Sequence, residues 1–297
     1  DLVHHFTIKP CIYGGIISRL LGIKNTINHI TGLGPSFYSN RIKIKYINQI
    51  LKPFYKFAFN NYKNNIVNIF HNNSDKNTFI KKSITKKEKT KTIEGSGVDI
   101  DYYKNEFSGS FNKEIKILFP ARIIKEKGII ELINACNDLW NSNYRFTLII
   151  AGLVDKQNRS YLKNKHFEFI KNNQNIKYIG KCSNMRDIYK TIDIVILPSW
   201  REGLSKSLLE SAAMSLPIIT TNVPGCNDII TNEYSGLLVP VRDKEKLKSA
   251  IKKYLHNPEL AIKYGMNARK KVTKKYKVEI INNQILKVYD DILKRKK

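Results

Sequence analysis

Residues 193–230 contain the pattern that most restricts what this chain can fold into. DIVIL, at 193–197, is an apolar run of strand length that stops before a Pro-Ser pair. After the loop WREGL, apolar side chains recur at helical spacing over 208–216, with Ser205 as a candidate N-cap. Pro217 ends that helix, and the strand PIITT follows. Strand, loop, helix and strand in this order predict a parallel sheet covered by helices.

Two acidic residues mark one end of this unit. Glu202 lies in the loop after the first strand, and Glu210 lies two turns into the helix. Parallel sheets bind ligands at the carboxyl ends of their strands, and a helix N-terminus there offers amide groups to a phosphate. A carboxylate further along the helix can accept hydrogen bonds from sugar hydroxyls. Two acids at this spacing are usually solvated surface residues, so the neighbouring residues must decide.

The same alternation continues through most of the chain. We expect strands at 1–6, at the start of 26–38, and at 65–70, 115–121, 144–152 and 175–180. We expect helices at 13–23, 128–140, 184–190, 244–256, 258–272 and 278–294. Residues 41–62 are basic and aromatic, and Pro53 should break or kink a helix there; residues 81–92 read as a solvated charged stretch. The series from 115 onward predicts a doubly wound parallel sheet.

A longer motif, which contains both acids, indicates a function for them. EGLSKSLLESAAMSLPIITTNVPGCNDII resembles the nucleotide-sugar loop of retaining glycosyltransferases of family 4, which have the two-domain GT-B fold. The family's Gly, Leu-Glu and Pro positions are present, and Ser211, Ser215 and Leu216 are mild departures. The resemblance implies an α/β chain with two Rossmann-like doubly wound parallel-sheet domains.

The resemblance also suggests domain boundaries. It implies a partial N-terminal acceptor-side domain at 1–106, a linker at 107–114, a nucleotide-sugar-binding domain at 115–275, and a helix at 276–297 that crosses back to the first domain. DLVHHF resembles a middle strand of the first domain, and the chain begins without Met. We therefore expect an N-terminally truncated copy whose first domain is incomplete.

The donor side is assigned residue by residue. ARIIKEKG resembles the family's R-x-x-x-x-K-G, which implies that Arg122 and Lys127 hold the donor diphosphate and stabilise its departure. Glu202 would hold the transferred hexose, and Glu210 the ribose hydroxyls. These give Glu202, Arg122 and Lys127 as catalytic candidates. The donor-binding candidates are Arg122, Lys127, Gly203, Leu204, Ser205, Lys206, Ser207 and Glu210.

The acceptor side resembles one branch of the family. TGLG follows the second strand, as in the branch that acts on capsule and lipid-linked saccharides and includes N-acetylgalactosaminyltransferases. In much of the family a His stands beside the transferred sugar, but Thr31 occupies that position here, so no catalytic His is carried over. Thr31, Gly32 and Lys9 are the acceptor-side candidates. The branch implies a UDP-HexNAc or related donor, a glycan or polyprenyl-diphosphate-linked saccharide acceptor, and transfer with retention.

No cofactor and no metal are expected. Asp99 and Asp101 form a D-x-D, but their segment resembles the GSGVD that closes the family's first domain, and two acids are weak evidence for a metal. The four cysteines have no metal or disulfide spacing, which suits a reducing cytoplasm. His4 and His5 on a strand are typical of structural residues.

The formal net charge of +27 leaves three interpretations open. Lys, Asn and Ile crowd the whole chain, which base composition can explain without a partner. An anionic membrane surface, such as the inner face of the plasma membrane, would suit residues 41–62. Nucleic acid is disfavoured because the lysines are dispersed. A nucleotide-sugar epimerase of the same fold is the alternative enzyme.

Overall fold

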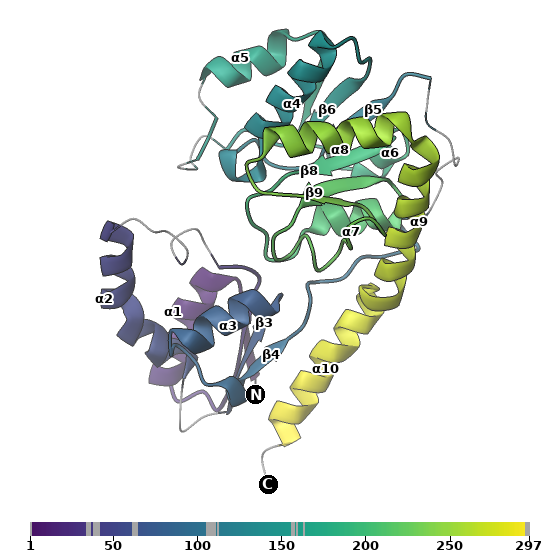
Figure 1. The fold of residues 1–297 in the computed structure, drawn as a ribbon. Coiled ribbons are helices and arrows are strands. Elements are labelled where there is room, and N and C mark those ends of the chain that lie inside the picture. The colour runs from purple at the N-terminus through teal and green to yellow at the C-terminus, as the bar shows by residue number, and fades with distance from the viewer. Residues whose placement is uncertain are drawn as a thin grey trace. The chain divides into compact units, whose positions relative to one another are not determined.

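The computed structural model describes residues 2–33, 37, 42–60, 65–104, 111, 113–155, 158, 160–162 and 164–294, without the side chains of 42–48 and 164. The chain divides into two compact units (Figure 1): unit 1 is Asp1–Gly97 with Val278–Lys297, and unit 2 is Val98–Lys277. The first boundary thus falls earlier than the residue 106 that the sequence suggested. Most of the expected linker lies outside the described residues, and the acceptor role of unit 1 stays a prediction.

Unit 1 contains a four-stranded sheet in the order β1-β2-β3-β4, with all neighbours parallel. Its strands are β1 (Leu2–Phe6), β2 (Asn25–Ile30), β3 (Asn65–Phe70) and β4 (Thr90–Thr92). Its helices are α1 (Ile8–Leu20), α2 (Ile42–Phe59), α3 (Asn73–Lys81), the short 3-10 turn η2 (Lys87–Lys89) and α10 (Val278–Lys294).

The two faces of this sheet have separate cores, because neighbouring side chains of a strand point to opposite faces. Phe70 at the end of β3 packs with residues of α1, α2 and α3. Ile69, one residue earlier, packs instead against α10, with Val288 and Ile292. The last helix of the chain therefore completes the core of the first sheet.

Three expectations for unit 1 were wrong in detail. The first helix begins at Ile8, not 13, since Pro10 falls in its first turn, where a missing N–H is tolerated. Helix α2 is not broken at Pro53, because Tyr55, Ala58 and Phe59 hold its inner face in the core, so of the expected break or kink only the break is wrong. Within the stretch expected to be solvated, β4 pairs with β3 and completes the sheet.

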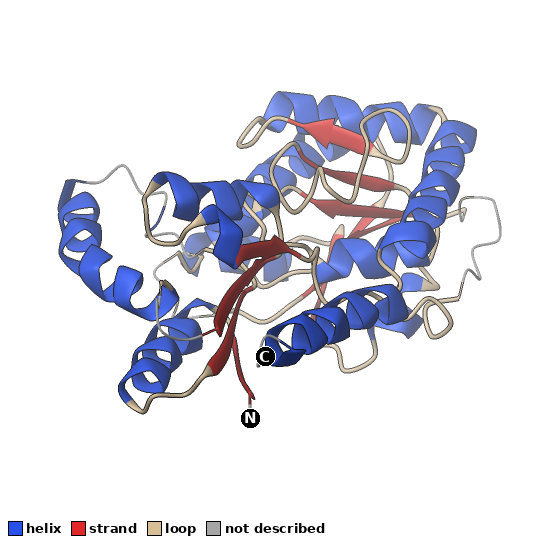
Figure 2. Cartoon of the chain, turned by 90° about the horizontal axis from the view of Figure 1, so that it is seen from below, coloured by secondary structure: helices blue, strands red, loops and turns tan. Residues whose placement is uncertain are grey.

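Unit 2 contains a six-stranded parallel sheet in the order β10-β9-β8-β5-β6-β7, with helices on both sides (Figure 2). Its strands are β5 (Lys116–Phe119), β6 (Thr147–Ala151), β7 (Ile176–Gly180), β8 (Ile194–Leu197), β9 (Ile218–Thr221) and β10 (Leu237–Val239). Its helices are the 3-10 turn η3 (Lys125–Lys127), α4 (Ile129–Asn141), α5 (Asn164–Asn172), α6 (Met185–Tyr189), α7 (Lys206–Ala213), α8 (Lys244–His256) and α9 (Pro258–Lys275). The expected doubly wound sheet is confirmed.

The strand order fixes where unit 2 can bind a ligand. From β5 the chain runs outward through β6 and β7, and it then returns to β8 on the other side of β5. The loops after β5 and β8 therefore diverge onto opposite faces of the sheet. In an open parallel sheet, the crevice at such a switch point is the preferred ligand site.

Three histidines of unit 1 lie in mutual contact. The rings of His4 and His29 stack with centroids 5.4 Å apart, and His71 Nε2 lies 3.1 Å from His29 Nε2. His4 Nδ1 also lies 2.7 Å from the hydroxyl of Tyr289 on α10. Burial lowers the pKa of His4 to about 4, of His29 to about 3 and of His71 to about 4. These rings are therefore neutral near pH 7 and help to join the strands and α10.

Unit 1 should lose stability in mild acid. The folded pKa values lie below the ordinary value near 6.5, so between about pH 6.5 and pH 4 the unfolded chain binds more protons and stability falls as the pH falls. His29 alone should account for about 2 kcal/mol between pH 7 and pH 5. Hydrogen exchange of the peptides from β2 and β3 should show the loss of protection. His29→Gln should make this acid-induced loss of protection smaller, and His256→Gln on α8 should leave it unchanged. Equal protection at pH 7 and pH 5 in the unaltered chain would contradict the expectation.

Candidate functional site

A pocket of about 330 Å³ opens at the carboxyl edge of the unit 2 sheet. It lies where the loops after β5, β6 and β7 meet the start of α7. Its lining residues are Pro120, Ala121, Arg122, Ala151, Gly152, Leu153, Lys181, Cys182, Met185, Tyr189, Lys206, Ser207 and Glu210. Four candidates from the sequence, Arg122, Lys206, Ser207 and Glu210, therefore share one pocket.

Helix α7 begins at this pocket because of its N-cap. Ser205 Oγ accepts a hydrogen bond from the Leu208 N–H at 3.4 Å, as the sequence predicted. Leu208 and Leu209 are buried and fix the helix against the sheet. The first turn of α7 leaves amide groups without helical acceptors, and its positive dipole end favours an anion. The local structure therefore suits a phosphate beside Lys206 and Ser207.

Glu210 is a buried carboxylate that faces this pocket. It is only 7% exposed, and its Oε2 accepts a hydrogen bond from the Tyr189 hydroxyl at 3.2 Å. Its other oxygen lies 3.7 Å from Lys206 Nζ. Burial raises the pKa of Glu210, although hydrogen bonds from Tyr103 and Tyr189 and the charge of Lys206 oppose the shift. The carboxylate is thus held in place with acceptor capacity directed to the pocket.

Arg122 is held by an acid at the pocket rim. Its Nη1 donates to Asp155 Oδ2 at 2.9 Å, and the guanidinium side chain is 57% exposed. An exposed ion pair of this kind contributes little to stability, so the guanidinium can exchange its carboxylate for a phosphate at low cost.

Lys127 and Glu202 form a second, more buried pair. Lys127 Nζ lies 2.5 Å from Glu202 Oε1, and their side chains are 20% and 10% exposed. The same oxygen accepts a hydrogen bond from Ser199 Oγ at 2.7 Å. These two candidates contact each other and are not among the residues that line the pocket with Arg122 and Glu210. The sequence indicated both residues but not their pairing.

Glycines allow the loops of the site to approach closely. Gly128 has φ +74°, and a Cβ there would lie 2.0 Å from the Pro198 carbonyl oxygen. A Cβ on Gly152 would lie 1.9 Å from the carbonyl oxygen of Ala121. A Cβ on Gly225 would lie 2.7 Å from the Gly203 carbonyl oxygen, and Leu204 packs on the core beside it. The loops after β5, β6 and β8 therefore pack closely against one another through their backbones.

Several pocket residues were not found from the sequence. Tyr189 comes from α6, and Lys181 and Cys182 follow β7. Asp155, which pairs with the lining residue Arg122, follows β6 and was not found either. No motif marks them; the available signal was only that they follow strands of the same parallel sheet. The acceptor-side candidates lie in unit 1, with Thr31 and Gly32 directly after β2 and Lys9 exposed in α1.

The structure also bears on metals and membranes. Among the described residues, no group of three or more His, Cys, Asp or Glu could hold a metal ion. Asp99 Oδ1 instead accepts hydrogen bonds from the N–H groups of Asp101 and Tyr102, at 3.0 Å and 2.8 Å, which closes a turn. Within the same described ranges, no helix has the length and apolarity needed to cross a bilayer.

Gly128→Ala should destabilise unit 2 by about 2 to 5 kcal/mol, because the left-handed backbone and the contact with Pro198 each oppose a Cβ. Urea unfolding followed by tryptophan fluorescence measures this, since both tryptophans, Trp140 and Trp200, lie in unit 2. Gly180→Ala is the matched control: its φ is +67°, but its Cβ would have 3.9 Å to the nearest atom, so strain alone should cost about 1 to 2 kcal/mol. Equal losses in the two variants would count against the close loop packing.

The sequence of this chain, including the pocket residues, is similar to those of known proteins. The family model described as Glycosyl transferases group 1 matches residues 103–271, which include the whole pocket. The capsular polysaccharide biosynthesis glycosyltransferase CapM of Staphylococcus aureus is 27% identical over 197 residues. That match covers 66% of this chain and 51% of CapM, so the chain spans about half the length of this relative.

Two further proteins match almost the whole chain. The N,N'-diacetylbacillosaminyl-diphospho-undecaprenol alpha-1,3-N-acetylgalactosaminyltransferase of Campylobacter jejuni is 23% identical over 306 residues, covering 99% of this chain and 78% of that protein. The crystal structure of HepE from Anabaena in complex with UDP-glucose superposes with a TM-score of 0.82 at 19% identity, over 98% of this chain and 79% of HepE. The second likeness concerns the fold alone.

Proposed function

The chain belongs to the group 1 glycosyl transferase family, and on that premise we propose that it moves a sugar from a UDP-sugar donor to a growing glycan. The observation that carries this proposal is the pocket at the switch point of unit 2, where Arg122, the start of α7 and the buried Glu210 meet. Cationic and amide groups suit a diphosphate, and a fixed carboxylate suits ribose hydroxyls. HepE, which shares the fold, was solved with UDP-glucose bound.

Each part of the donor then has a partner. Arg122 exchanges Asp155 for the diphosphate, and the α7 amides near Ser205 to Ser207 face the same group. Glu210, oriented by Tyr189, accepts from the ribose hydroxyls. Glu202 holds the transferred hexose, and Lys127 orients that carboxylate through their ion pair while adding positive charge beside the diphosphate.

The chemical step places charge where this site can stabilise it. The bond between the anomeric carbon and the diphosphate oxygen breaks, and its electron pair stays on that oxygen. The acceptor hydroxyl oxygen bonds to the anomeric carbon, and its proton passes to the departing diphosphate. Arg122, Lys127 and the α7 amides stabilise the developing charge; one such group is typically worth a factor of ~10² to 10³ in rate. These cations take the place of a metal in this proposal. Retention, as in family 4, is part of it.

The acceptor proposal comes from the relatives. The Campylobacter jejuni protein is named for a sugar carried on diphospho-undecaprenol, and CapM for capsular polysaccharide. By analogy we assign a HexNAc or related hexose as the transferred sugar and a glycan or polyprenyl-diphosphate-linked saccharide as acceptor, with Thr31, Gly32 and Lys9 on the acceptor side. Association with an anionic membrane surface stays a prediction. No specific observation favours an epimerase or a nucleic-acid-binding protein.

Arg122→Ala should weaken UDP binding by about 1.5 to 3 kcal/mol, the range for a hydrogen bond to a charged group. Isothermal titration calorimetry with UDP measures it. Arg145→Ala removes an exposed arginine from the same unit and should leave the affinity unchanged. Equal affinities of the Arg122 variant and the unaltered chain would remove Arg122 from the donor site.

Substitutions of Glu210 and Glu202 should have different effects, because the two acids contact different parts of the donor in this proposal. Glu210→Gln should weaken UDP binding about tenfold or more, because UDP itself contains the ribose. Glu202→Gln has the same charge change but should leave UDP affinity within about twofold while transfer from the UDP-sugar falls. Calorimetry and a transfer assay on both variants decide it, and the reverse pattern would show that the assignment is wrong.

A further inference from the structure

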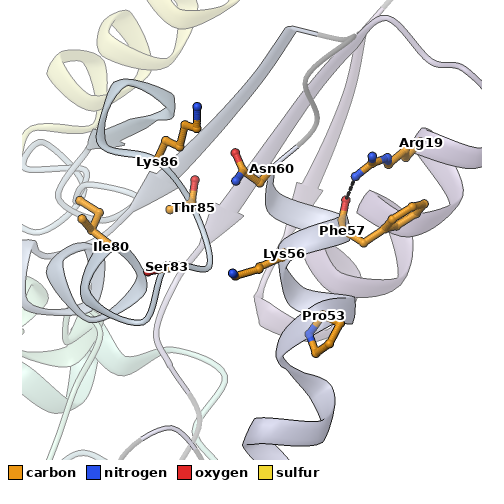
Figure 3. A pocket seen from close by; sticks show the side chains of 9 residues that line it. All are labelled: Arg19, Pro53, Lys56, Phe57, Asn60, Ile80, Ser83, Thr85 and Lys86. Carbon is orange, nitrogen blue, oxygen red and sulfur yellow. Dashed lines mark hydrogen bonds between the residues drawn. The ribbon is translucent and has the colours of Figure 1, made fainter.

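Unit 1 contains a second pocket, which no part of the donor chemistry uses. It measures about 600 Å³ and lies between the end of α1, the second half of α2 and the loop that leads to β4 (Figure 3). Its lining residues are Arg19, Pro53, Lys56, Phe57, Asn60, Ile80, Ser83, Thr85 and Lys86. Lys86 Nζ lies 3.9 Å from Glu88 Oε1, and both side chains are exposed there.

The pocket lies at the amino edge of the unit 1 sheet. Arg19 comes just before β2, Asn60 before β3 and Lys86 before β4. The acceptor-side candidates Thr31 and Gly32 follow β2 and therefore lie at the carboxyl edge. Because the strands are all parallel, the two edges are opposite ends of the sheet, and the pocket is a separate site.

Positive charge is concentrated around this pocket. The pocket is lined by Arg19, Lys56 and Lys86. Lys89 lies close enough for the charges of Arg19 and Lys86 to affect its pKa. Partial burial lowers the pKa of Lys89, and so do the charges of Lys86 and Arg19, with Glu88 acting in the opposite sense. Such a group of like charges is stabilised by an anion, which would relieve their mutual repulsion.

Arg19, at one side of the pocket, is already oriented. Arg19 Nη1 donates to the Phe57 carbonyl oxygen at 3.1 Å, and its guanidinium carbon lies 4.0 Å from the centroid of the Phe57 ring. Figure 3 shows this contact, with Lys56, the residue before Phe57 in α2, directed toward the Ser83 loop. A preorganised arginine loses less entropy when it binds an anion.

An unsatisfied acceptor stands among the cations. Asn60 Oδ1 is buried and has no hydrogen-bond partner among the described residues. Beside it, Thr85 is 3% exposed, and its hydroxyl is engaged with Asn68 Nδ2 at 2.8 Å. A buried acceptor without a donor is costly, and when the Asn60 amide turns toward the pocket a hydroxyl of a bound molecule satisfies it.

We propose that this pocket binds the phosphate of a phosphorylated polyol, with Arg19, Lys56 and Lys86 on the phosphate and Asn60 Oδ1 accepting from a neighbouring hydroxyl. Two sources present this chemistry: the headgroup of an anionic phospholipid such as phosphatidylglycerol, and a soluble ester such as glycerol 3-phosphate. The size of the pocket accommodates either headgroup or ester.

The test compares two pairs of substitutions in the full chain. Lys56→Gln with Lys86→Gln removes two charges from the pocket, and Lys24→Gln with Lys287→Gln removes two exposed charges elsewhere in unit 1. Glycerol 3-phosphate binding, measured by calorimetry, should fall about tenfold or more in the pocket pair and stay within about twofold in the control pair. It should persist in Arg122→Ala, which separates this site from the donor pocket.

Flotation with phosphatidylcholine vesicles, with and without phosphatidylglycerol, identifies the source. A loss of phosphatidylglycerol-dependent binding in the pocket pair only assigns a lipid headgroup; glycerol 3-phosphate binding without vesicle binding assigns a soluble ester. Asn60→Ala should reduce the preference for glycerol 3-phosphate over inorganic phosphate, since only the ester has the hydroxyl. Equal losses in both pairs indicate diffuse electrostatic attraction and overturn the proposal, as does the absence of binding to either probe.

Discussion

The parallel pairing of β5 with β8 is the constraint on which the rest of unit 2 depends. It brings the loop after each strand to the same edge of the sheet, although more than seventy residues separate them in the chain: Leu118 lies opposite Val195. The loops then meet at Gly128 and Pro198, where only a glycine leaves room. Lys127 and Glu202 can form their ion pair because these backbones approach so closely.

The environment of each carboxylate gives the two acids different properties. Glu202 is paired with Lys127 and accepts from Ser199, so its charge is compensated within the protein. Glu210 is equally buried but takes its hydrogen bonds from tyrosine hydroxyls, and burial raises its pKa. A compensated carboxylate can orient a sugar rigidly, whereas Glu210 retains acceptor capacity for a ligand that supplies hydroxyl donors. The proposed division between hexose and ribose rests on the resemblance to family 4, and this difference is compatible with it.

Local signals were sufficient for most elements. The helices α8 and α10 begin and end where apolar periodicity and capping residues placed them, and Ser205 caps α7 as expected. The failures share one cause. Strand β4 forms because β3 provides hydrogen-bond partners, and α2 continues past Pro53 because its inner face is held in the core. Such tertiary contacts override local preference, and a single stretch of sequence does not contain them.

The sequence by itself determined the α/β class, the doubly wound sheet of unit 2 and four of the residues that line its pocket, because strand periodicity, helix caps and the motif around Glu210 are properties of short segments. Only the tertiary structure decided how those residues pair. Lys127 binds Glu202, Arg122 binds Asp155, and Tyr189 orients Glu210. Each pair joins segments that follow different strands, so it depends on strand order and loop packing. Periodicity along the chain contains no information about either.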